Sequence, residues 1–363
     1  MIEGNFIKRN KSKWIIAIVL IIGIKIFTSN PLWVEKYYSS GIYVLFSKTL
    51  RIFFGWIPFS LGDILYFVAF CWIVWKIMMN VRLLIKRQLT RKKAIQKILK
   101  TVFLFTSIYI IFYLFWGINY DRKGIAFQLQ LKPIDYDTAD LFMIENILLE
   151  KVNATKIVVT KSHKKYPSTD QLILGAKKSY NEAHRKFPFL DYNRTSVKSS
   201  LYGSLGNYLG FTGYYNPFTG EAQINTTVPQ MLRPYIATHE MAHQLGYAKE
   251  NEANFVGYLA AVNSHDTLFQ YSTYLDLFLY TSREIYYFDS VSSHNIMEKL
   301  NPLVKEDLEE LRQFDIAHRN VLEPAISWMY GNYLKLNNQP RGLHSYSAVV
   351  AMLIAYYKRY GEI

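Results

Sequence analysis

Three long apolar stretches in the first third of the chain restrict its fold more than any other feature. They cover about residues 14–29, 56–79 and 101–119, and with their flanking residues each can cross the hydrocarbon core of a bilayer. A helix is the expected form, because in lipid the backbone polar groups must be satisfied within the segment. The first stretch could instead be a cleaved signal peptide, but Thr-Ser-Asn-Pro at 28–31 is a poor cleavage site. The sequence therefore predicts a membrane domain over residues 1–119 with three transmembrane helices.

Positive charge is concentrated between the second and third stretches. Residues 80–100 contain eight Lys and Arg and no acid, in a chain of formal net charge +14. A nucleic-acid-binding patch is conceivable, but a basic loop between two membrane helices is typical of the cytoplasmic side. We therefore expect a cytoplasmic loop at 80–100, a cytoplasmic N-terminus, and a chain that lies outside the cytoplasm from about residue 120. The charge then reports orientation, and no nucleic-acid partner is expected.

From Tyr120 onward the sequence is that of a globular domain. Apolar spacing and breaker residues predict several helices, at 137–152, 170–187, 268–287, 305–318 and 325–336, and a last helix that opens near 341–347. A turn at 216–220 leads into a predicted strand at 221–225, and 201–211 looks strand-like or loop-like. The expected fold class is mainly α with a small β portion.

Residues 239–243 of this globular region read His-Glu-Met-Ala-His. Residues four apart share a helix face, so His239 and His243 can bind one metal ion, and Glu240 can reach a water molecule on that ion. Two histidine ligands and a carboxylate base are the zinc-peptidase arrangement. Pro234 and Gly246 are plausible limits of the helix. The alternative is a half-buried helix with two structurally satisfied histidines.

A zinc site needs a third protein ligand. The metzincin pattern requires a histidine at position 249, where Lys249 stands. A short turn at Gly246 would bring a second helix beside the first and place either Glu250 or Glu252 near the metal. Glu250 could bind the metal while Asn254, four residues later, hydrogen-bonds a ligand. Glu252 stays open as the alternative.

The sequence E-x-x-A-N at 250–254, downstream of H-E-x-x-H, resembles the gluzincin peptidases, including the membrane-embedded CAAX-type proteases. Asn254 departs from the aspartate that many of these have. The resemblance implies a Zn²⁺ cofactor with Glu250 as the third ligand, in a zincin-like α+β domain over residues 120–363. It also implies a strand beside the metal helix that pairs with the substrate, for which 214–225 is the candidate. A downstream side chain would stabilise the oxyanion, and the candidates are Tyr346, which we favour, His344 and Arg341.

Over nearly its full length the chain resembles a bacterial membrane family of unknown function, numbered thirty-eight-ten among such domains. The resemblance is carried by the three membrane helices and by three motifs, G-Y-Y-N-P-F-x-G-E-A-Q-x-N at 213–225, H-E-M-A-H-Q-L-G-Y at 239–247 and E-x-E-A-N-F at 250–255. It implies a multi-pass protein of the bacterial cytoplasmic (inner) membrane whose C-terminal domain is periplasmic or extracytoplasmic. It implies no substrate.

Together these inferences predict a membrane-anchored zinc metallopeptidase that acts on a protein or peptide outside the cytoplasm. Zinc held by His239, His243 and Glu250 would lower the pKa of a bound water toward ~7, and Glu240 would accept its proton and later protonate the leaving amine. The alternatives are a non-catalytic zinc-stabilised scaffold or sensor, a cell-wall peptide amidase, and a transporter component. The expected partners are the lipid bilayer and the substrate, and the sequence leaves the oligomeric state unknown.

Overall fold

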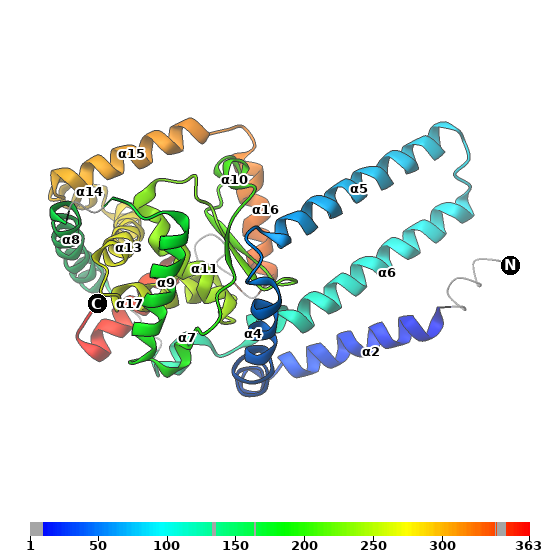
Figure 1. Cartoon of the computed structure of the whole chain (residues 1–363), viewed down its shortest axis with the longest axis horizontal. Coiled ribbons are helices and arrows are strands. Elements are labelled where there is room, and N and C mark those ends of the chain that lie inside the picture. The colour runs from blue at the N-terminus through cyan, green and yellow to red at the C-terminus, as the bar shows by residue number, and fades with distance from the viewer. Residues whose placement is uncertain (1–9, 133–135, 163–164, 338, 340–345) are drawn as a thin grey trace.

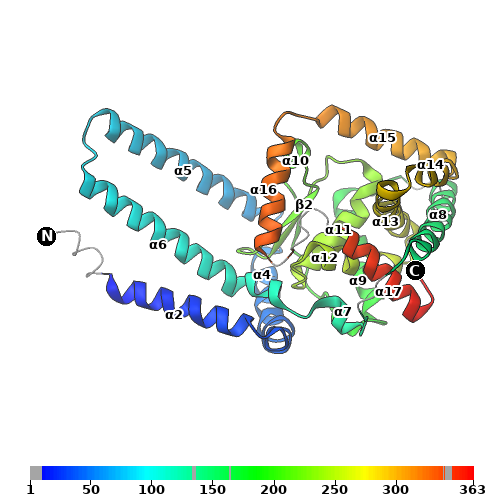
Figure 2. The same ribbon diagram turned by 180° about the vertical axis from the view of Figure 1, so that it is seen from behind.

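Three long helices project side by side from one face of a globular part (Figures 1 and 2). They are α2 (Lys11–Thr28), α5 (Leu61–Ile85) and α6 (Arg91–Phe115). Two of them, α5 and α6, are long and apolar enough to cross a membrane, and a third span results if α2 is counted with the bent helix that follows it. The computed structural model describes residues 10–132, 136–162, 165–337, 339 and 346–363.

The membrane helices continue further into the basic segment than the sequence predicted. The predicted loop at 80–100 is mostly helical, and only residues 86–90 connect α5 to α6. Lys and Arg are good helix formers, so the charges do not stop the helices. The break comes at Arg87, whose φ of 52° lies in the left-handed region. The basic side chains therefore lie on the last turn of α5, on the first turns of α6 and, for Lys86 and Arg87, in the connection between them.

A short helical segment, here called the junction helix (residues 31–54), runs between the projecting helices and the globular part. It consists of α3 (Pro31–Trp33), η1 (Val34–Ile42) and α4 (Tyr43–Phe54), and it is bent by 92° from α2. One face is buried, with Tyr43, Ser47 and Arg51 against the globular part and Tyr38 against α6, where its hydroxyl donates to the carbonyl of Leu114. The opposite face exposes large apolar side chains, among them Trp33, Leu45 and Phe53. Such two-sidedness suits a helix that lies along a membrane surface.

The globular part is mainly helical, as predicted. All the predicted helical segments are present, and their ends agree within a few residues except at 137–152, where α8 continues nine residues further, to Lys161. In chain order the helices are η2 (Gly117–Asp121), α7 (Gly124–Gln128), α8 (Thr138–Lys161), α9 (Thr169–His184), η3 (Pro188–Leu190), α10 (Gly203–Leu209), η4 (Gln230–Leu232), α11 (Arg233–Gln244), α12 (Glu250–Val262), α13 (Thr267–Phe288), α14 (Ser290–Glu298), α15 (Pro302–His318), α16 (Glu323–Leu336) and α17 (Tyr346–Tyr360).

A three-stranded sheet forms the small β portion. Its order is β1 (Val197–Ser199), β3 (Glu221–Ile224), β2 (Gly213–Asn216), with β1 parallel and β2 antiparallel to β3. The predicted turn and the strand after it are confirmed by the hairpin of β2 and β3. The strand-like or loop-like prediction for 201–211 was wrong, because α10 forms there. Its glycines weaken the helical signal, but Gly203 allows close packing, since a Cβ there would lie 2.7 Å from Asn225 Oδ1.

The apolar core of the globular part surrounds α11 and α12. These two helices pack against each other and against α9 and α13, while α17 covers α12. They approach closely at Gly257, where a Cβ would lie 3.0 Å from the backbone nitrogen of His239. The buried centre of the domain is thus the pair of helices that carries the candidate metal ligands.

Candidate metal centre

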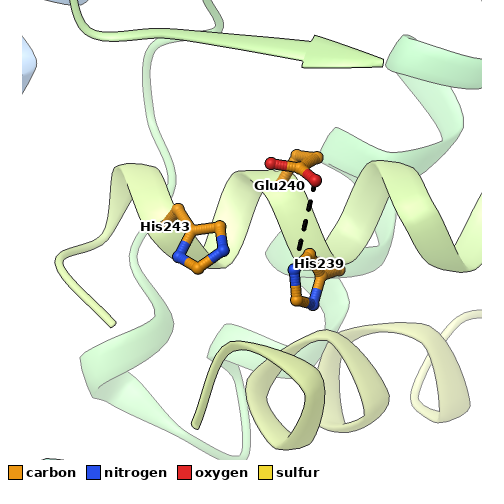
Figure 3. A group of neighbouring side chains, drawn as sticks. All are labelled: His239, Glu240 and His243. Carbon is orange, nitrogen blue, oxygen red and sulfur yellow. Dashed lines mark ion pairs between the residues drawn. The ribbon is translucent and has the colours of Figure 1, made fainter. Parts of the chain in front are cut away.

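The H-E-x-x-H residues lie together on α11 (Figure 3). The helix has Pro234 in its first turn and ends before Gly246, whose φ of +85° is favourable for glycine alone. One ligand atom from each of His239, Glu240 and His243 lies within 4.8 Å of the others. Both imidazoles and the carboxylate are nearly buried, with side chains 13%, 4% and 6% exposed for His239, Glu240 and His243.

The turn at Gly246 folds α12 back beside α11 and brings Glu250 to both histidines. Glu250 Oε2 lies 3.4 Å from His239 Nε2, and Glu250 Oε1 lies 3.8 Å from His243 Nε2. Glu252, the alternative ligand, lies elsewhere, with its Oε1 3.7 Å from Lys249 Nζ and its carboxylate against Gly124. Of the two acids, the geometry therefore brings Glu250 to the histidines.

The imidazole of His243 is oriented by the turn that follows its helix. Its Nδ1 lies 2.7 Å from the carbonyl oxygen of Tyr247. A carbonyl can only accept, so Nδ1 carries the proton and the lone pair of Nε2 faces Glu250. Metal-binding histidines are commonly held in this way. Asn254 contributes to raising the pKa of His239, and its predicted support of a ligand stays a prediction.

Charges of opposite sign meet in this cluster. Burial opposes the charge of His239, but Glu250 and Glu240 outweigh it and raise the pKa of His239 to about 9. Burial also opposes the charge of Glu250, and the two histidines outweigh it and lower the pKa of Glu250 to about 2. Burial lowers the pKa of His243 to about 4, and burial raises that of Glu240 to about 8. A paired imidazolium and carboxylate beside a neutral imidazole is an arrangement in which a divalent cation can replace the proton.

The edge strand β2 begins directly over the carboxylate of Glu240. A Cβ at Gly213 would lie 2.7 Å from Glu240 Cδ, so the absence of a side chain at 213 leaves room for the acid. Glu240 Oε2 is buried and has no hydrogen-bond partner among the residues that the structure describes. The predicted strand beside the metal helix is therefore present, and its site-facing residue is glycine.

One side of the site is covered by α16, which the sequence did not connect with it. The Tyr330 hydroxyl hydrogen-bonds to Glu250, and the backbone N–H of Glu250 donates to Gln339 Oε1 at 3.1 Å. Tyr333, one turn further, pairs its hydroxyl with that of Tyr120 at 3.0 Å.

The favoured oxyanion candidate Tyr346 begins α17, but its side chain lies outside the described residues. The two other candidates, His344 and Arg341, also lie outside the described residues. The sequence signal for the α16 contact was the i, i+3 spacing of Tyr330 and Tyr333 on a predicted helix.

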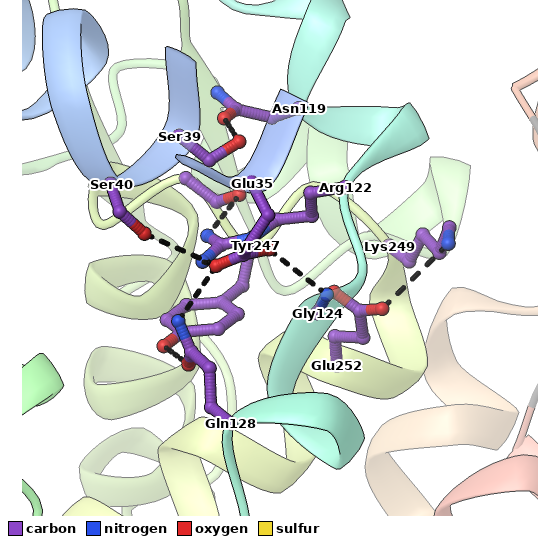
Figure 4. Close-up of polar contacts among 11 residues, drawn as sticks. Glu35, Ser39, Ser40, Asn119, Arg122, Gly124, Gln128, Tyr247, Lys249 and Glu252 are labelled. Carbon is purple, nitrogen blue, oxygen red and sulfur yellow. Dashed lines mark hydrogen bonds and ion pairs between the residues drawn. The ribbon is translucent and has the colours of Figure 1, made fainter. Parts of the chain in front are cut away.

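A buried ion pair ties the Gly246 turn to the junction helix (Figure 4). Arg122 donates through Nε and Nη2 to the Glu35 carboxylate at 3.0 and 2.7 Å, and through Nη1 to the carbonyl of Gly246 at 3.1 Å. Gln128 donates to the same carboxylate at 2.9 Å and accepts from the Tyr247 hydroxyl at 2.6 Å. The turn that holds His243 and starts α12 is therefore anchored to an element outside the globular part.

Comparison with known proteins gives one family. A family model with the description "Protein of unknown function (DUF3810)" matches residues 38–354, a range that contains α5, α6 and both helices of the candidate metal centre. No curated protein and no solved structure matches the chain.

Proposed function

We propose that this chain, which belongs to the family described as "Protein of unknown function (DUF3810)", is a membrane-anchored zinc metallopeptidase. One observation carries the proposal. One ligand atom each of His239, Glu240 and His243 on α11 lies within 4.8 Å of the others, and Glu250 of α12 adds carboxylate oxygens 3.4 and 3.8 Å from the two histidines. Two imidazoles, one carboxylate and an adjacent free carboxylate match the donor set of catalytic zinc sites.

The residues of this chain divide the chemistry between them. His239, His243 and Glu250 would hold the ion, and a zinc ion bound there supplies Lewis-acid activation of water and of the scissile carbonyl. Glu240 accepts a proton from the attacking water and returns it to the leaving amine. Water is added across the C–N bond, so the products are a carboxylate and an amine. The geometry supports this assignment because Glu240 follows the ligand His239 in the chain, and its carboxylate lies within 4.8 Å of the ligand atoms of His239 and His243.

Two further elements fit a peptidase. The edge strand β2 starts over Glu240, and an extended substrate backbone could pair with such a strand. Tyr330 already contacts Glu250 and is a donor placed to stabilise an oxyanion, beside the earlier candidate Tyr346. The zincin-like character of the domain is part of this proposal.

The proposed topology follows the distribution of basic residues. In it α2, α5 and α6 cross the bacterial cytoplasmic membrane, the connection at 86–90 lies in the cytoplasm, and the globular part lies outside. The basic residues on the cytoplasmic ends of α5 and α6 support this orientation.

The test is zinc content and turnover of the full chain, purified in detergent. Wild type and Glu240→Gln should each hold about one zinc ion per chain, and only wild type should hydrolyse a mixed peptide library. Glu250→Ala should lose zinc, whereas Glu252→Ala, a matched change two residues away, should keep it. Full turnover by Glu240→Gln would contradict the mechanism. Stoichiometric zinc without turnover would favour the scaffold or sensor, and release of peptides from peptidoglycan alone would favour the amidase.

A further inference from the structure

The C-terminal end of the metal helix lies against the end of a membrane helix. Trp116 follows the last residue of α6, and its indole Nε1 donates to the carbonyl of His243 at 3.4 Å. The rings of Trp116 and His243 are 6.1 Å apart between centroids. This carbonyl, in the last turn of α11, already accepts from the backbone N–H of Gly246 at 2.9 Å, and the residue that follows an apolar span adds a second donor.

The junction helix contacts the same end of α11. Tyr43 and Ser47 donate their hydroxyls to the carbonyl of Gln244, at 3.3 and 2.7 Å. The exposed face of this helix carries Trp33 and Phe53, 48% and 65% exposed, which suits contact with the interfacial layer of a bilayer. Two elements with independent membrane signals therefore meet the metal helix at one point.

These contacts fix the height of the site above the membrane. Trp116 is buried in the protein, but it follows the last residue of an apolar span, and such an end lies near the level of the lipid headgroups. With His243 beside Trp116, the metal centre lies within about one helix diameter, ~10 Å, of that level. An extended chain advances ~3.3 Å per residue, so about three residues separate the site from the membrane surface.

The helix α16, which covers one side of the site, exposes apolar side chains on its outer face. While Tyr330 of α16 turns to Glu250, Trp328, Met329 and Leu336 on the same helix are 71%, 65% and 82% exposed. In both views α16 lies on the side of the globular part that faces the projecting helices, beside the end of α5 (Figures 1 and 2). Large apolar side chains on that side are suited to the bilayer surface.

From this placement we infer that the substrate is a polypeptide anchored in the same bilayer, cut in an extended segment within a few residues of its own membrane helix. The inference rests on the proposed peptidase function and adds the substrate class. A soluble protein would have to bring a flexible segment down to the membrane surface. A membrane-anchored chain presents such a segment at the height of the site and is concentrated by its anchor.

The experiment uses the full chain, loaded with zinc and reconstituted in phosphatidylcholine–phosphatidylglycerol vesicles. The substrates are two libraries with the same randomised eight-residue segment before a fluorescent reporter domain. In one the segment follows a transmembrane helix directly, or after spacers of 10 or 30 residues, and in the other it follows a soluble helix. Glu240→Gln in the same vesicles gives the background. We expect the anchored library without a spacer to be cut at least tenfold faster than the soluble one, with cut sites mapped by mass spectrometry close to the membrane helix.

The outcomes separate the inference from the proposed function on which it rests. Equal rates on the anchored and soluble libraries would overturn the substrate class and leave the peptidase in place. Cutting of the randomised segment at an undiminished rate behind the 30-residue spacer would do the same. If neither library is cut above the Glu240→Gln background, both proposals fail.

Discussion

Neutralising Glu35 gives the sharpest test of how the junction helix supports the metal centre. In Glu35→Gln the carboxylate that accepts from two nitrogens of Arg122 becomes an amide, and the guanidinium stays charged in a site where its side chain is 2% exposed. Removing one partner of a buried pair costs about 3–5 kcal/mol, because the other charge is left without compensation. For a chain of 363 residues, with ~2.1 cal/mol/K of unfolding entropy per residue, that corresponds to a fall in Tm of roughly 4–7 °C.

The matched control is the exposed pair of Glu309 and Arg312, which are 54% and 58% exposed. Glu309→Gln removes the same charge at the surface and should leave Tm unchanged. Because Arg122 also holds the carbonyl of Gly246, we expect Glu35→Gln to weaken zinc binding about tenfold as well. Thermal unfolding in detergent and competition with a zinc chelator measure the two effects. A Glu35→Gln protein with the Tm and zinc affinity of Glu309→Gln would refute the reasoning.

Three more predictions concern single side chains. Gly213→Ala should keep zinc but lower kcat about a hundredfold, because its methyl group would displace Glu240, while Gly23→Ala, with no atom within 4 Å of the added methyl, should leave both unchanged. Tyr330→Phe should lower kcat roughly tenfold or more at unchanged zinc content, and an unaltered kcat would remove it as an oxyanion donor. Burial raises the pKa of Glu145 to about 8, above its unfolded value, so the stability from its neutral form is present below pH ~4.3 and is lost as pH rises through 8. Glu145→Gln should therefore raise Tm at pH 9 and change it little at pH 4; equal shifts at both would show that the carboxyl does not titrate there.

The metal helix and its neighbour could be predicted because their signals are local. The i, i+4 spacing of His239 and His243 fixes a common face once the segment is helical. Gly246 then supplies the left-handed residue that ends one helix and lets the next return beside it. From those two facts alone the choice between Glu250 and Glu252 stays open, because it depends on the rotation of α12 about its own axis. Packing at Gly257 sets that rotation, and sequence spacing does not encode it.

The rest of the site comes from contacts between residues far apart in the chain. Tyr330 reaches Glu250 across eighty residues, and Gly213 meets Glu240 only because a hairpin packs across α11. The i, i+3 spacing of Tyr330 and Tyr333 predicts a shared helix face but not what that face contacts, so the sequence offered Tyr346 as the downstream donor on resemblance alone. The error at 201–211 has a similar origin, since tertiary packing overrides the weak helix propensity of a glycine-rich segment. The helices α5 and α6 extend past the predicted spans and show the reverse effect. There, good helix formers lengthen an element past the limits set by hydropathy.

The contacts at the end of α11 connect the first third of the chain to the candidate metal centre. Trp116 is a second donor to the carbonyl of His243, Tyr43 and Ser47 donate to that of Gln244, and Glu35 pairs with the charge of Arg122. A fragment that starts at residue 120 would lose all of these partners at once and would leave a buried guanidinium unpaired beside the Gly246 turn. The same turn sets the imidazole of His243 and the start of α12. One set of hydrogen bonds therefore connects the candidate metal ligands to the apolar helices, so changes at Trp116, Tyr43 or Ser47 should reach the candidate metal centre as well.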